Sequence, residues 1–360
     1  MPCSSSFIRS DRRRWFMLSL TRSVRYLIPF ALGLATATAS AATTPRQQWK
    51  TDIGQGYQQL ASSAHVLEQT ASHYCDSPSA DTRQQLEAAW KTAFLDWQAV
   101  RFVDFGPIEQ NSRAWQLQFW PDHKNLVARK VSYALKQDKP VDAAFVDQAG
   151  VALQGFPAIE YLLYDADMQQ GERALPAADT CHLLDTISTH LAGTADALAS
   201  DWQAFGDYYV SMDEYTEKTV AAAINGLEIL QDKRLAAPMG VRPPHKRNKY
   251  LGDAWRSENS VAAMRASIAG FKQYMVPGLT QLLNDAGHPE LADKLVEQTD
   301  STLAKANDLP DAMAPFLKTD EGYRKLQSLF IDVIQLEQVV EDRIAPALGI
   351  TRGFNSSDGD

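Results

Sequence analysis

The sequence lacks an excess of positive charge and any apolar run long enough to span a membrane. Its 35 lysine and arginine residues are outnumbered by 44 aspartate and glutamate residues, which gives a formal net charge of −9. A surface with this balance repels phosphate backbones and anionic lipid, so we expect no nucleic-acid partner. The longest apolar run, at residues 27–35, is far shorter than the roughly 20 residues that a spanning helix needs.

Common catalytic and phosphate-binding motifs are also missing. The chain contains no His-Glu-x-x-His zinc motif, no Gly-x-Ser-x-Gly elbow and no Gly-x-x-x-x-Gly-Lys phosphate loop. A zinc peptidase needs two or three protein ligands, an open coordination position for water and a general base. The missing motifs favour a protein without enzymatic activity.

What the chain does have is a secretory pattern at its N-terminus. Two arginines precede the apolar run, and the small residues Ala-Ser-Ala at 39–41 follow it as a cleavage site. We expect residues 1–41 to be a cleaved signal peptide, a periplasmic location and no membrane insertion of the mature protein. Translation starts at Met1 or at Met17. The second start is an alternative because the residues before Met17 add nothing that a signal peptide needs.

Cleavage would change both the charge and the cysteine count. It removes six arginines and one aspartate, which leaves 29 basic against 43 acidic residues, a net charge of −14. Of the three cysteines, only Cys75 and Cys181 remain. An even number in an oxidising compartment favours a disulfide between them, although a sequence does not give their distance.

The rest of the sequence has helical periodicity, so we predict an all-α fold. Apolar residues recur at three- and four-residue spacing, and alternating β-branched runs are rare. One face of the stretch after Asp81 is apolar throughout, at Leu86, Trp90, Ala93, Phe94, Trp97 and Val100. The principal helices are expected near residues 47–74, 81–103, 120–137, 157–164, 178–203, 211–236, 258–285 and 320–345.

Four amphipathic helices can close around one core, so eight predict two four-helix-bundle-like domains packed together with a cleft between them. Helix-breaking residues at 165–177 favour a boundary there. The predicted organisation is signal peptide 1–41, N-terminal bundle 42–175, C-terminal bundle 176–350 and a tail at 351–360.

Two loops differ from plain connectors. FGPIEQ (105–110) and FWPD (119–122) combine aromatic residues, prolines and acids. Prolines that stiffen a loop can hold a neighbouring carboxylate in place, which is typical of a binding site. The alternative is that Trp115, Phe119 and Trp120 close the end of a bundle, because aromatic side chains mostly bury area.

Several segments together resemble one family, the imelysin-like proteins, also called the M75 peptidase family. They are RFVDFGPIEQ, QLQFWPD, GFPAIEYLLYD, GLEILQDKRLAAPMG, AWRSENSVAAMRASIAGF and the terminal ALGITRGFNSSDGD. The resemblance implies an exported helical protein linked to iron uptake, with two four-helix-type bundles and a cleft between them.

The resemblance also implies a motif that this chain departs from. The signature of the family is Gly-x-His-x-x-Glu, and here the frame is Gly155-x-Pro157-x-x-Glu160. Histidine and glutamate three residues apart lie on one helical face and can bind one cation. Pro157 offers no ligand atom but suits a first helical turn. Glu160 is then either a structural carboxylate or the remaining member of a metal site.

The resemblance groups a set of possible ligand-binding residues, of which Glu160 is the metal-ligand candidate. If they converge, their oxygens suit iron or another divalent or trivalent cation; no cofactor is certain. The set is Arg101, Glu109, Trp120, Asp122 and Glu160.

Other candidates have a plainer interpretation. His65 and Glu68 repeat the His-x-x-Glu spacing without the preceding glycine, and a solvated helix face explains them. His123 follows Asp122 and is interpreted as a surface residue. Glu337 falls on the apolar stripe of the last long helix, where a buried carboxylate would need a partner.

The first functional hypothesis is a periplasmic, imelysin-like binding protein without enzymatic activity, associated with iron acquisition and carrying a degenerate metal motif. The second is a metal-dependent peptidase of the M75 type. The third is a periplasmic interaction protein that binds no small ligand and acts beside an outer-membrane partner. A metal ion or a periplasmic or outer-membrane protein is the expected partner.

Overall fold

The computed structural model describes residues 43–137 and 141–350, and no β-strand occurs in them. The all-α prediction is therefore confirmed. None of the helices in these two ranges combines the length and the apolar character needed to cross a bilayer. The predicted signal peptide at 1–41 and the tail at 351–360 lie outside the described residues.

Long helices dominate the first part of the chain. The first begins with a capping box, in which the Thr44 hydroxyl and the Gln47 side chain satisfy each other's backbone N–H groups. The helices are α1 (Pro45–Asp76), α2 (Ala80–Val100), α3 (Arg113–Leu117), α4 (Leu126–Ala134), α5 (Ala143–Ala149), α6 (Gly155–Tyr164) and α7 (Ala178–Ser211), with 3-10 turns η1 (Gly106–Ser112), η2 (Val151–Leu153) and η3 (Ala166–Met168).

The second part of the chain contains helices interrupted by π-helical turns. These are α8 (Glu214–Glu228), α9 (Ala237–Met239), α10 (Ser260–Gly270), α11 (Val276–Asp285), α12 (Pro289–Asn307), α13 (Ala314–Lys318), α14 (Asp320–Gln338) and α15 (Ala345–Ala347). The π-helical turns are η4 (Ile229–Ala236), η6 (Phe271–Met275) and η7 (Val339–Ile344), and η5 (Lys249–Leu251) is a 3-10 turn. Such turns insert an extra residue without ending the helix.

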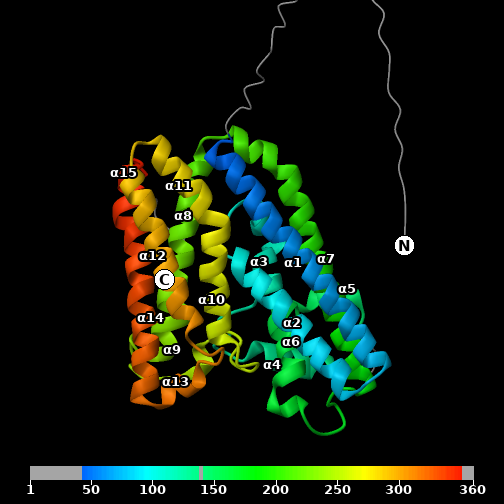
Figure 1. Ribbon diagram of the computed structural model, residues 1–360. Coiled ribbons are helices and arrows are strands. Elements are labelled where there is room, and N and C mark those ends of the chain that lie inside the picture. The colour runs from blue at the N-terminus through cyan, green and yellow to red at the C-terminus, as the bar shows by residue number, and fades with distance from the viewer. Residues whose placement is uncertain (1–42, 138–140, 351–360) are drawn as a thin grey trace, which may run out of the picture. The chain divides into compact units, whose positions relative to one another are not determined.

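The helices enclose two clusters of buried apolar side chains. Helix α1 lies between α2 and α7, α10 packs on α2, and α12 packs on α11 and α14. In Figure 1 the helices up to α7 stand beside those from α8 onward, and α10 lies where the two groups meet. The Trp49 indole N–H donates to the backbone oxygen of Met275 at 2.9 Å, which ties α1 to η6.

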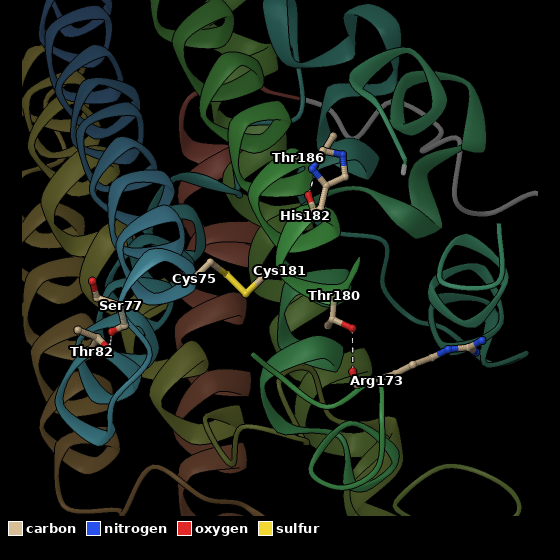
Figure 2. The surroundings of a disulfide bond; sticks show 8 residues. All are labelled: Cys75, Ser77, Thr82, Arg173, Thr180, Cys181, His182 and Thr186. Atoms are coloured by element: carbon tan, nitrogen blue, oxygen red, sulfur yellow. Dashed lines mark hydrogen bonds between the residues drawn. A yellow bond between two sulfur atoms is a disulfide. The ribbon is translucent and has the colours of Figure 1, made fainter. Parts of the chain in front are cut away.

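A disulfide joins α1 to α7. Cys75, at the end of α1, is bonded to Cys181, at the start of α7, with a Cα–Cα distance of 5.6 Å (Figure 2). The predicted pairing is confirmed. The bond closes a loop with a sequence separation of 106, and such links typically stabilise a fold by about 2–4 kcal/mol, largely by restricting the unfolded chain.

Two details of the helix prediction were wrong. The segment expected from residue 120 becomes helical only at Leu126, and the 19-residue helix α12 was not expected at all. Helix α7, which begins just after the predicted boundary at 175, packs along α1 and α6. The division into two bundles stays a prediction.

Candidate functional site

Four segments that are distant in sequence surround one pocket of about 340 Å³. They are α2, the loop before α4, the start of α6 and the loop before α10, so three of the family-like segments meet here. Its lining residues are Trp90, Phe94, Gln118, Phe119, Trp120, Asp122, His123, Asn125, Val127, Phe156, Pro157, Glu160, Asp165, Tyr250, Gly252, Ala254, Trp255 and Arg256.

Gly155 positions α6 at this pocket. Its φ of +70° lies in the left-handed region, and a Cβ atom there would stand 2.2 Å from the backbone oxygen of Gln116 and 2.3 Å from that of Leu117. Only glycine tolerates both conditions. The helix begins at this residue, so the predicted helix start is confirmed, and Pro157 of its first turn lines the pocket.

Glu160 is buried, with 5% of its surface exposed. Its Oε1 accepts hydrogen bonds from the backbone N–H of Ser257 at 2.9 Å and from the Ser257 hydroxyl at 2.8 Å. Burial raises the pKa of Glu160, and the two bonds from Ser257 and the charge of Arg256 oppose that shift. The bonds tie α6 to the loop before α10.

Asp122 has a structural task. Its Oδ1 accepts from the backbone N–H of Leu126 at 2.7 Å, and its Oδ2 accepts from that of Val127 at 2.9 Å. Both oxygens therefore satisfy N–H groups at the start of α4, the standard use of an aspartate before a helix. The neighbouring Trp120 also lines the pocket, and the Arg101 guanidinium lies 5.7 Å from the centroid of its ring.

Arg101 belongs to a buried polar network behind the pocket. It donates to the side-chain oxygens of Gln98 at 3.1 Å and of Gln118 at 3.0 Å. Asp253 accepts from Arg234 and lies 3.6 Å from Arg101. Burial and the charge of Arg234 lower the pKa of Arg101 to about 9, while Asp253 acts in the opposite direction. Gln118 connects this network to the pocket wall.

Glu109 lies elsewhere. It is exposed in the first turn of η1, and its Oε2 accepts from the backbone N–H of Gly106 at 2.8 Å. The structure thus gathers Trp120, Asp122 and Glu160 around one pocket, sets Arg101 directly behind it and leaves Glu109 outside the lining.

Sequence reasoning missed the contribution of the loop before α10. The family-like stretch AWRSENS contained the signal, but we assigned no site residue to it. Arg256 donates from Nε to Asp165 at 2.5 Å, and its guanidinium stacks 4.3 Å from the Trp255 ring centroid. Both residues line the pocket.

The pocket does not fit a metal ion held by protein ligands. Pro157 has no donor atom, both oxygens of Asp122 cap α4, and Oε1 of Glu160 is held by Ser257. Within residues 43–137 and 141–350, three His, Cys, Asp or Glu ligand atoms come within 4.8 Å of one another only at Glu228, Glu337 and Glu341.

That cluster consists of three glutamates and lies outside the pocket. Glu337 of α14 is 9% exposed, and Glu341 of η7 and Glu228 of α8 face it. Burial and the hydrogen bond with Glu341 raise the pKa of Glu337 to about 8. A shared proton between neighbouring carboxyls accounts for the direction of the shift.

Residues 53–340 match the family model of imelysin, peptidase family M75. The chain belongs to the imelysin family. Its fold is similar to an imelysin-like protein from Psychrobacter arcticum 273-4, with a TM-score of 0.72, 20% identity and coverage of 86% of this chain and 98% of that one.

A second solved structure with a similar fold is that of a protein described as an iron-regulated protein A precursor from Parabacteroides distasonis ATCC 8503. The TM-score is 0.61 at 16% identity, with 85% of this chain and 97% of that chain covered. At these identities the likeness establishes the fold alone. No curated protein sequence matches the chain.

Proposed function

We propose that this imelysin-family chain is an exported binding protein without enzymatic activity, associated with iron acquisition, and that the pocket around Pro157 and Glu160 is its ligand site. The observation that carries the proposal is the pocket itself. A closed helical scaffold leaves about 340 Å³ open at the family-like motif, lined by aromatic rings and one buried carboxylate. Concave sites that combine aromatic walls with placed polar and charged groups are typical of small-ligand binding.

The donor set supports binding over hydrolysis. A metal-dependent peptidase requires ligands that hold an ion and activate water. Here both oxygens of Asp122 are engaged by α4, and Oε1 of Glu160 is engaged by Ser257. Pro157 replaces the histidine that the family resemblance implies. The iron-acquisition context rests on family membership and on the name of the Parabacteroides relative.

Hydrolysis of an unstructured protein substrate tests the proposal against the peptidase alternative. We expect no cleavage above the blank by wild type or by Glu160→Gln, with or without added zinc. Cleavage that a chelator abolishes and that Glu160→Gln lacks would overturn the proposal and establish the peptidase.

Export has its own test. When the full chain is expressed in a Gram-negative host, we expect the mature protein in the periplasmic fraction with Ala42 as its first residue, because cleavage follows the Ala-Ser-Ala sequence at 39–41. Retention of an uncleaved chain in the cytoplasm would contradict the exported role.

A further inference from the structure

We propose that the pocket binds a small organic cation, with an ammonium group beside Glu160 and an apolar or aromatic body between the aromatic walls. This inference rests on the proposed function and specifies its ligand class.

The charge of the lining is the first argument. Three carboxylates, Asp122, Glu160 and Asp165, line the pocket with one arginine, Arg256, and one exposed histidine, His123. Arg256 is matched by Asp165 at 2.5 Å, so its charge is already balanced. The remaining carboxylates leave the wall negative, which attracts a cation and disfavours an anionic ligand.

The arginines behind the pocket do not reverse this balance at the wall. Arg234 donates to Asp253, Gln98 and Ser267, and Arg101 donates to the Gln98 and Gln118 oxygens. Neither arginine belongs to the lining. Their donors are directed into the buried network, away from a ligand.

Aromatic rings are the second argument. Trp90, Phe94 and Phe156 form a fully buried base, and the Trp90 N–H is satisfied by the Phe156 backbone oxygen at 3.2 Å. Trp120 and Trp255 are partly exposed and line the walls. Their rings already hold the guanidinium groups of Arg101 and Arg256 within 5.7 Å. Ring faces of this kind attract cations electrostatically.

Glu160 is the anchoring group. Ser257 holds Oε1 from two donors, so the carboxylate has a fixed orientation and Oε2 is the oxygen left for a ligand. An ammonium supplies N–H donors to such an oxygen, and a charged hydrogen bond in a buried site is stronger than a neutral one. A bare metal ion would need several more ligand oxygens, which the aromatic walls do not supply.

The test compares two ligands that differ in one group. Tryptamine carries an ammonium, and tryptophol carries a hydroxyl in its place on the same indole body. Isothermal titration at neutral pH would measure both against the mature wild-type protein, Glu160→Gln and, as a control outside the pocket, Glu337→Gln. Glutamine has the shape of glutamate and keeps an oxygen for Ser257.

We expect wild type to bind tryptamine about tenfold or more tightly than tryptophol, because only the ammonium pairs with the buried carboxylate. Glu160→Gln should remove that difference by weakening tryptamine alone, and Glu337→Gln should preserve it. The wild-type comparison needs no variant, so equal affinity for the two ligands overturns the inference even if Glu160→Gln folds poorly.

Three results would overturn the inference: equal affinity for both ligands, a preference for tryptamine that survives Glu160→Gln, or no binding of either ligand. The first and second still leave a ligand-binding pocket and therefore the proposed function. Failure of the proposed function itself has a different signature, which is chelator-sensitive hydrolysis.

Discussion

Glu160 and Glu337 are both buried carboxylates on helices, yet their surroundings differ in kind. Glu160 accepts two hydrogen bonds from Ser257 and lines a pocket with aromatic walls. Glu337 meets two further carboxylates, Glu228 and Glu341. Burial raises the pKa of both. The neighbouring groups act differently on the two carboxyls. The hydrogen-bond donors beside Glu160 favour its charged form, whereas the acids beside Glu337 disfavour the charged form of that residue.

The difference teaches that a carboxylate is suited to ligand binding when the protein holds its charged form in place. Ser257 and Arg256 act in this direction on Glu160, while burial, the larger influence, raises its pKa. Glu337 retains a proton to a higher pH, which lowers the free-energy cost of burying it. The neighbouring acids therefore account for its raised pKa without any ligand.

The largest expected effect comes from removing the anion behind the pocket. Asp253→Ala leaves Arg101 and Arg234 buried without their shared carboxylate. We expect the free energy of unfolding to fall by about 3–5 kcal/mol, because an uncompensated buried charge is costly. Urea unfolding at neutral pH measures it. The salt bridge between the partly exposed Lys50 and the fully exposed Asp207 supplies the control, Asp207→Ala, for which a much smaller loss of stability is expected. Equal effects of the two variants would contradict the network.

Gly155→Ala should rank second. A Cβ atom there meets two backbone oxygens and also takes a φ of +70°, so we expect a loss of about 2–4 kcal/mol in stability. Gly349→Ala is a matched control, because Gly349 has a φ of +69° with nothing within 4 Å of the added atom. It should cost only about 1 kcal/mol. If both variants lost the same amount, close packing of α6 would not be the reason for the glycine.

Glu337→Gln should sharpen the comparison through pH. The folded pKa of Glu337, about 8, lies above its ordinary value of 4.5. The folded state therefore holds an extra proton between these values, and this contribution to stability, full below pH 4.5, is lost as pH rises to about 8. Asp342 and the two neighbouring glutamates add to the shift.

We expect Glu337→Gln to flatten that pH dependence and to raise the melting temperature at pH 8 by about 2 °C. Differential scanning calorimetry from acidic to alkaline pH follows both proteins. The exposed Glu321→Gln on the same helix should leave the slope unchanged. If Glu337→Gln kept the pH dependence of the wild-type melting temperature, Glu337 would not be the group that causes it.

The smallest effect is expected at the partly exposed pair of His65 and Glu68. His65 contacts Glu68 at 3.0 Å and Asp196 of α7 at 2.7 Å, and these hydrogen bonds raise its pKa. Its contribution is present below the ordinary pKa of 6.5 and is lost as pH rises through the folded value. His65→Gln should cost less than about 1 kcal/mol at acidic pH and nothing at alkaline pH in urea unfolding. The reverse trend would contradict the ion pair.

Periodicity predicted most of the helices but failed where polar residues are buried. The inner face of α12 carries Gln298, Thr299 and Thr302, whose side chains are 8%, 0% and 0% exposed. The two threonine hydroxyls donate to carbonyls four residues earlier. The threonine hydroxyls are therefore satisfied within the helix, and Gln298 donates to the backbone oxygen of Asp332 in α14. Polar residues of this kind can pack inside, but a pattern of apolar residues alone does not reveal them.

The candidate site was predicted in part for a similar reason. Aromatic and acidic loops drew attention to Trp120 and Asp122, and the motif drew attention to Glu160. A sequence does not show that both oxygens of Asp122 accept hydrogen bonds from the start of α4. Nor does it show that the backbone N–H of Ser257, 97 residues away, donates to Glu160. Those contacts depend on long-range packing, as does the position of Glu109 outside the lining.

The most direct test of the central claim, that this pocket is not a metal site, is zinc titration of wild type, Glu160→Gln, Pro157→His and the double variant. We predict no Glu160-dependent zinc binding in wild type. Pro157→His should gain weak binding that Glu160→Gln removes, because the restored pair shares one helical face. Stoichiometric zinc binding by wild type that is lost in Glu160→Gln would contradict the account.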